Sequence, residues 1–94
     1  MEVLKPYRAR IDAVDDQIID LLAVRFGIIR EVGHLKAEQN IAPVLPDRVE
    51  QVRERCVERA VEQGIDGNLV RQLYTLIITH ACDMEEKIRE EKAA

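Results

Sequence analysis

The sequence predicts an all-α protein built from three helices, the first of them unusually long. Apolar residues recur every three or four positions over most of the chain, which is the spacing of one face of a helix. Runs of β-branched residues bounded by turn signals, which would indicate strands, are absent. Apolar residues make up 47% of the 94 residues and aromatic residues only 3%, so leucine, isoleucine and valine must fill the core. This length fits a single domain covering residues 1–94.

The first helix is expected over residues 4–38. Pro6 suits its first turn, where a missing N–H is harmless. The apolar stripe of this helix steps alternately by three and four residues, and Arg25 interrupts it. The apolar members of the stripe are Leu4, Tyr7, Ile11, Val14, Ile18, Leu21, Ile28, Val32 and Leu35.

A second copy of the chain is expected to cover part of this helix. The helix would be roughly 50 Å long, whereas a compact chain of this size is only about 30 Å across. The length therefore predicts a homodimer. The alternative is a break at Gly27 or Gly33, giving two shorter helices in a monomeric bundle. Because glycine costs only about 1 kcal/mol inside a helix, the continuous helix is preferred.

Two further helices follow after a short loop at residues 40–46. The second is expected from about Pro46 to Gln63, with Val49, Val52, Cys56 and Ala60 on its apolar face. Gly64 ends this helix, and Asp66 caps the third, which should reach about Glu90 before the last residues, EEKAA, fray. The predicted inner face of the third helix comprises Leu69, Leu73, Leu76, Ile77, Ala81, Met84 and Ile88.

Charge and composition exclude several classes of function. A formal net charge of −4 with no uncompensated basic face argues against nucleic acid as the main partner. No stretch approaches membrane-spanning length, and the N-terminus lacks the apolar run of a signal peptide. Cys56 and Cys82 fit reduced core cysteines better than a disulfide, so a cytoplasmic protein is expected. His34 and His80 have no ligands at metal spacing, so no metal site is expected.

Arg25 is the strongest functional signal. A guanidinium on an apolar stripe needs a partner or a ligand, because an unpaired buried charge costs several kcal/mol. Lys36 lies on nearly the same side of the helix, roughly 16 Å further along, a span that two long side chains can shorten around a small anion. Arg8 is about 25 Å from Arg25 along the axis, so only an antiparallel partner could bring it to the same site. Three cations around one pocket would suit a compact dianion.

Each cation also has an ordinary structural interpretation. Arg25 could snorkel or pair with a carboxylate across the bundle. Lys36 could be a solvated cation that favours the helix dipole, and Arg8 alone would be a surface residue.

Glu85 lies beside the apolar line of the third helix and allows two interpretations. A carboxyl buried there tends to remain protonated and can donate a hydrogen bond. Alternatively, Glu85 forms an ion pair with Lys87 or Arg89 at the helix surface.

The chain resembles the all-helical class of chorismate mutases over most of its length. The resemblance is carried by Arg8-x-x-Ile11-x-x-x-Asp15, Leu21-Leu22-Ala23-x-Arg25, Glu31-Val32-Gly33-x-x-Lys36, the Pro46-Asp47-Arg48 opening of the second helix, and Leu73-Tyr74-x-x-Ile77-Ile78. The spacing of three cations along one long helix is its specific part. The resemblance implies an intertwined homodimeric bundle with two equivalent active sites, each completed by an arginine from the other subunit.

The resemblance also implies roles for individual residues. Arg25 and Arg8 of the partner subunit would hold the two carboxylates of chorismate, and Arg48 would reinforce the anion site at its mouth. Lys36 would bind near the enolpyruvyl ether oxygen and a carboxylate, and Glu85 stands where the family usually has a glutamine that hydrogen-bonds that oxygen. The implied reaction is a Claisen rearrangement to prephenate without a cofactor. The cations would hold the substrate in a compact chair, and Lys36 and Glu85 would stabilise negative charge that grows on the ether oxygen.

Three departures from the family pattern keep the substrate open. Leu45 and Val49 replace carboxylates that recognise the ring hydroxyl, Ala81 replaces a serine near the ring carboxylate, and Glu85 replaces the glutamine. Apolar residues at the hydroxyl end resemble isochorismate-pyruvate lyases and 4-amino-4-deoxychorismate mutases, which share this fold. Both remain alternatives to chorismate mutase. A third alternative, of another class, is a non-catalytic helical dimer for assembly or regulation, with Arg25 locked in an interhelical ion pair.

Overall fold

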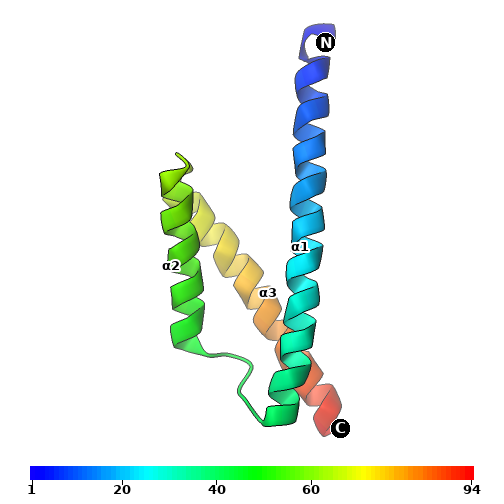
Figure 1. The fold of residues 1–94 in the computed structure, drawn as a ribbon, viewed down its shortest axis with the longest axis vertical. Helices are drawn as coiled ribbons and strands as arrows, with labels where there is room; N and C mark the ends of the chain where they lie inside the picture. The colour runs from blue at the N-terminus through cyan, green and yellow to red at the C-terminus, as the bar shows by residue number, and fades with distance from the viewer.

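The computed structural model describes residues 1–94 as three α-helices without a strand (Figure 1). A short 3₁₀ turn, η1 (Glu2–Leu4), leads into α1 (Lys5–Gln39), which is followed by α2 (Pro46–Glu62) and α3 (Gly67–Ala93). The predicted all-α class with a long first helix is confirmed. The helix α3 continues to Ala93, beyond its predicted end near Glu90, through residues with high helix propensity, and the fraying of EEKAA stays a prediction. The assignment of residues 1–94 to a single domain stays a prediction.

The helix α1 runs without a break through Gly27 and Gly33, so the alternative of two shorter helices is wrong. It ends at Gln39 and is capped by Asn40, whose left-handed backbone (φ 58°) turns the N–H of the next residue, Ile41, back to the Lys36 carbonyl at 2.8 Å. The chain is consequently extended, at 56 Å along its longest axis. Its radius of gyration is 17.0 Å, against roughly 12 Å for a compact chain of this length.

The helix α3 crosses diagonally and is the only helix that packs against both others (Figure 1). Val57 and Ala60 of α2 and Val70 of α3 form a small buried cluster. On the other side, α1 meets α3 at the buried Gly33, where an added Cβ would lie 2.9 Å from Ile88 Cδ1. The two helices cross so closely here because glycine has no side chain.

The predicted inner face of α3 is wrong in the first half of the helix. Leu69, Leu73 and Leu76 are exposed. The residues that follow Leu69 and Leu73, Val70 and Tyr74, are buried or half-buried in their place, and of the predicted residues Ile77 is half-buried. Apolar residues therefore cover two faces of α3 here, and the rest of the chain packs against only one of them.

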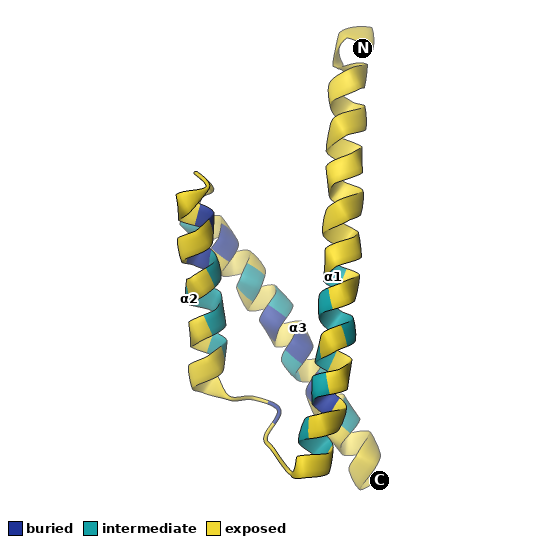
Figure 2. Cartoon of the chain, viewed as in Figure 1, coloured by how far each residue is buried: buried dark blue, intermediate teal, exposed yellow.

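Much of the apolar surface is uncovered. Only 8 of 94 residues are buried, and the chain exposes 7408 Å², whereas a compact monomer of this mass would expose about 5,500 Å². Figure 2 shows that the N-terminal half of α1 is exposed on all sides. None of the three helices combines the length and hydropathy that a membrane span requires.

Candidate active site

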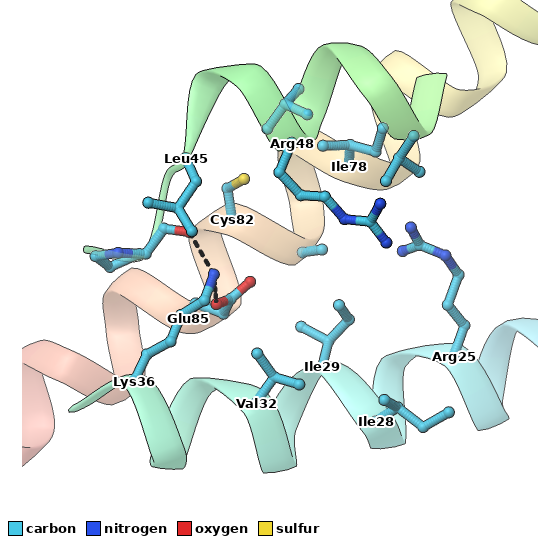
Figure 3. A pocket seen from close by; sticks show the side chains of 14 residues that line it. Arg25, Ile28, Ile29, Val32, Lys36, Leu45, Arg48, Ile78, Cys82 and Glu85 are labelled. Atoms are coloured by element: carbon cyan, nitrogen blue, oxygen red, sulfur yellow. Dashed lines mark hydrogen bonds and ion pairs between the residues drawn. The ribbon is translucent and has the colours of Figure 1, made fainter. Parts of the chain in front are cut away.

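A cavity of about 350 Å³ lies between the C-terminal half of α1, the start of α2 and the second half of α3 (Figure 3). Six of the seven predicted site residues line it: Arg25, Lys36, Arg48, Val49, Ala81 and Glu85. The rest of the wall is mostly apolar and comprises Ile28, Ile29, Val32, Pro43, Leu45, Val52, Ile78 and Cys82. Residues far apart in the sequence thus form one mainly apolar chamber with a few charged groups.

Lys36 and Glu85 form an ion pair at one end of the cavity. Lys36 Nζ lies 2.7 Å from Glu85 Oε1, and the two side chains are only 18% and 6% exposed. The alternative of a surface pair between Glu85 and Lys87 or Arg89 is therefore wrong, as is a fully solvated Lys36. The ammonium is not aligned for a hydrogen bond to Glu85 Oε1, so this buried oxygen has no donor. A ligand could supply one.

The Lys36 ammonium is also held by the loop that follows α1. Its Nζ donates a hydrogen bond of 3.0 Å to the carbonyl oxygen of Pro43, which is buried. The helices α1 and α3 approach closely at Gly33, where an added Cβ would lie 3.3 Å from Glu85 Cγ. This close approach brings Glu85 within reach of Lys36. The ammonium therefore has one hydrogen-bond acceptor and one counter-ion that hold it in place, and it keeps N–H groups for a ligand.

Arg25 reaches the cavity from α1 without a carboxylate partner. Its Nη1 is buried and has no hydrogen-bond partner, and no acidic oxygen lies within ion-pair distance of it. Its guanidinium carbon instead lies 5.9 Å from the centre of the Tyr74 ring. The interhelical ion pair of the structural alternative is therefore not formed within the chain, and the guanidinium has donors to offer an anion.

Arg48, at the start of α2, faces Arg25 across the cavity. Figure 3 shows the two guanidinium groups pointing toward one another. Arg48 Nη1 also donates a 2.6 Å hydrogen bond to Gln51 Oε1. Two like charges that face each other repel, and an anion between them would relieve that repulsion. Together with Lys36 and Glu85, the cavity has three positive groups and one negative group, a formal balance of +2.

Arg8 is the one predicted site residue that lies outside this cavity. It lies on the exposed N-terminal half of α1, about 25 Å from Arg25 along the helix axis. One chain therefore cannot bring Arg8 to the cavity.

Cys82 lines the cavity beside Glu85 and was predicted only as a core cysteine. Burial raises the pKa of its thiol, and the neighbouring Glu85 carboxylate raises it further. The thiol thus stays protonated at neutral pH, which does not suit a nucleophile. Both cysteines of the chain are free.

Sequence reasoning missed the Pro43 carbonyl and Tyr74 as neighbours of the two cavity cations. A backbone carbonyl acceptor has no residue-type signal. Tyr74 did have one, because it lies one helical turn before Ile78 on the face of α3 that packs inward.

The chain is similar to known proteins over most of its length. The family model of chorismate mutase type II matches residues 7–86. The 4-amino-4-deoxychorismate mutase of Streptomyces pristinaespiralis is 33% identical over 84 residues, covering 89% of this chain and 65% of the relative, so the chain spans just under two thirds of that protein. The protein of the same name from Streptomyces venezuelae is 28% identical, covering 90% of this chain and 82% of the relative. The chorismate mutase of Methanocaldococcus jannaschii is 25% identical, covering 97% and 92%.

Proposed function

The chain belongs to the chorismate mutase type II family, and from this premise we propose that it rearranges chorismate to prephenate. One observation carries the proposal: a mainly apolar cavity of about 350 Å³ holds three cations against one carboxylate. Chorismate is a small, largely apolar ring system with two carboxylates, so its charge balances the +2 of the cavity. Arginine gives paired hydrogen bonds to a carboxylate, and lysine adds a point charge.

In this proposal the cations bind the substrate and restrict its conformation. Arg25 and Arg48 lie on opposite sides of the cavity and would fix the carboxylates from both. Holding the flexible ether in a compact chair brings the two reacting carbons together and removes an entropic cost from the barrier. The rearrangement breaks a C–O bond as it forms a C–C bond, and no proton is transferred, so no nucleophile or base is required of the chain.

Lys36 would act on the transition state. Its free N–H would point at the ether oxygen, where negative charge grows as the C–O bond breaks, and such a preorganised donor lowers the barrier more than it tightens substrate binding. Its ties to the Pro43 carbonyl and Glu85 support this role because they keep the ammonium in place before the substrate arrives.

Glu85 would be a second donor to the same oxygen only in its protonated form. The ion pair with Lys36 requires the carboxylate instead. The protonated form of Glu85 would therefore donate to the ether oxygen, and the ionised form would hold Lys36 in place. If the acid is the active form, Glu85→Gln, which keeps a neutral donor, should retain turnover, whereas Glu85→Ala, which has no donor, should lose it. Equal turnover in the two variants would remove Glu85 from the mechanism.

We further propose that two chains share two sites, each completed by Arg8 of the partner subunit. Three features support this: the exposed apolar stripe on the N-terminal half of α1, the roughly 1,900 Å² by which the chain exceeds a compact monomer, and the position of Arg8 outside its own cavity. A cytoplasmic location belongs to the same proposal and is supported by the two free cysteines. Cell fractionation tests that location.

Mixing two inactive variants tests the shared site. Arg8→Ala and Arg25→Ala homodimers should each be nearly inactive. If the subunits are unfolded together and refolded in equal amounts, half of the dimers are mixed, and each mixed dimer has one intact site. The mixture should then recover about a quarter of the wild-type activity. No recovery, with mixed dimers verified by mass spectrometry, would contradict sharing.

A second candidate substrate is 4-amino-4-deoxychorismate. Two relatives are named for that activity, and Leu45 and Val49 leave one part of the cavity wall apolar. An isochorismate-pyruvate lyase on the same scaffold is the other alternative. The protein should be incubated with chorismate, isochorismate and the amino analogue, and the loss of each followed. Salicylate and pyruvate from isochorismate, with chorismate unchanged, would overturn the proposed reaction.

A further inference from the structure

The Arg25 guanidinium contacts an aromatic ring that does not line the cavity. The guanidinium carbon lies 5.9 Å from the centre of the Tyr74 ring, within the range in which a cation is attracted to a ring face. Tyr74 does not line the cavity, so this contact leaves the cavity side of Arg25 open. Since Arg25 has no ion pair and its Nη1 has no hydrogen bond, the ring is the contact that orients it.

The Tyr74 ring is itself fixed between α2 and α3. It packs against the buried cluster of Val57, Ala60 and Val70. Burial raises the pKa of the Tyr74 hydroxyl, and the neighbouring Cys56 of α2 raises it further, so the phenol remains neutral at physiological pH. A ring held by two helices is a rigid support for a flexible side chain from the third.

We propose that Tyr74 is a positioning residue that holds the Arg25 guanidinium ready for a substrate carboxylate. Without the ring, repulsion from Arg48 would move Arg25 away from the cavity. Substrate binding would then include the entropic cost of ordering a mobile side chain. The inference rests on the proposed function only in taking a dicarboxylate as the ligand.

This role has a kinetic signature that distinguishes it from simple core packing. A carboxylate is present in both the substrate and the transition state, so a misplaced Arg25 weakens both equally. Such a loss raises KM and leaves kcat nearly unchanged. A purely structural role would lower stability and leave both constants of the folded enzyme unchanged.

Three variants of the full chain test the proposal. Tyr74→Leu removes the ring, Tyr74→Phe keeps the ring without its hydroxyl, and Val70→Ala loosens the same cluster without touching Arg25. We expect Tyr74→Leu to raise KM about three- to tenfold with kcat within about twofold of wild type, and Tyr74→Phe to stay close to wild type. Val70→Ala should lower the thermal midpoint and leave KM unchanged. An unchanged KM in Tyr74→Leu, or an equal rise in Val70→Ala, would overturn the proposal.

A measurement without turnover separates this inference from the proposed function. In the wild-type protein, NMR should show contacts between the Tyr74 ring protons and the Arg25 δ protons, with the Arg25 Nε–H resonance displaced by the ring. The displacement should persist in Tyr74→Phe and disappear in Tyr74→Leu. Its absence in the wild type would overturn the positioning role even if Tyr74→Leu does not fold. Failure of all three substrates to react would refute the proposed function, and the NMR result would still decide the role of Tyr74.

Discussion

The two halves of α1 share one apolar stripe but have different surroundings. In the C-terminal half, Gly33 is buried against α3, and Arg25 and Lys36 line the cavity. In the N-terminal half, the same stripe continues through Ile11 and Ile18, which are 59% and 50% exposed. A uniform pattern therefore has two outcomes within one chain: one half builds the cavity, and the other half is exposed, where the proposed second copy would pack. The pattern specifies which face is apolar and does not specify what covers it.

The largest expected effect belongs to the cavity half. Arg25→Ala should lower kcat/KM about 100- to 1,000-fold, because it removes a charged donor that nothing else in the chain replaces. Arg30→Ala, on the exposed side of the same helix, is the matched control and should have little effect. Steady-state kinetics and circular dichroism check both. A large gain in stability without loss of activity would instead favour the non-catalytic helical dimer.

The exposed half can be tested by adding a charge. Ile11→Asp places a carboxylate on the stripe, and Ala9→Asp places the same charge about 200° around the helix. If a second copy covers the stripe, only Ile11→Asp should dissociate the dimer, at a cost above about 3 kcal/mol. Sedimentation velocity and the thermal midpoint measure this. Equal behaviour of the two variants would mean that the stripe stays in water.

Two glycines of α1 sharpen the comparison within the covered half. Gly33→Ala should destabilise the protein by about 1–3 kcal/mol, since its Cβ would meet Ile88 Cδ1 at 2.9 Å and displace Glu85. Gly27→Ala would meet only the end of the Arg30 side chain at 3.8 Å, and should stabilise the helix by about 0.5–1 kcal/mol. Urea unfolding gives both values. A neutral Gly33→Ala would show that the helices do not cross this closely.

The smallest effect is the pH dependence of a pair between α2 and α3. Arg71 donates to Glu54 at 2.7 Å, and this hydrogen bond lowers the pKa of the Glu54 carboxyl. A lowered folded-state pKa means that the stabilisation is present above the unfolded pKa and is lost as the pH falls through the folded one. The thermal midpoint of wild type should therefore exceed that of Glu54→Gln near neutral pH, and the difference should disappear in acid. A constant difference would contradict this origin.

The sequence predicted the elements well because they depend on local signals. Pro46 at the start of α2, Asp66 as the cap of α3 and the three-four spacing of α1 fix helix limits without reference to the rest of the chain. Arg25, Lys36 and Glu85 were recognisable because a charge on an apolar face requires compensation.

The contacts between helices could not be predicted from the sequence. Whether Leu73 or Tyr74 faces inward depends on the angle at which α3 crosses its neighbours, and both belong to an apolar helix face. The partner of Glu85 was misassigned for the same reason, because Lys36 is remote in sequence and only the crossing at Gly33 brings it close. The Lys36 contact with the Pro43 carbonyl depends on the path of a loop, which no residue pattern encodes.

The loop between α1 and α2 also determines how the chain can vary in length. The start and the middle of this loop are tied to one residue, because Asn40 and Ile41 donate backbone N–H groups to the Lys36 carbonyl and Pro43 accepts from the Lys36 ammonium. An inserted residue here would shift the Pro43 carbonyl and with it the position of the Lys36 ammonium. The turn at residues 63–66 has no such contact with the cavity. Insertion libraries in the two connections should therefore give opposite results, with tolerance after α2 and loss of turnover after α1.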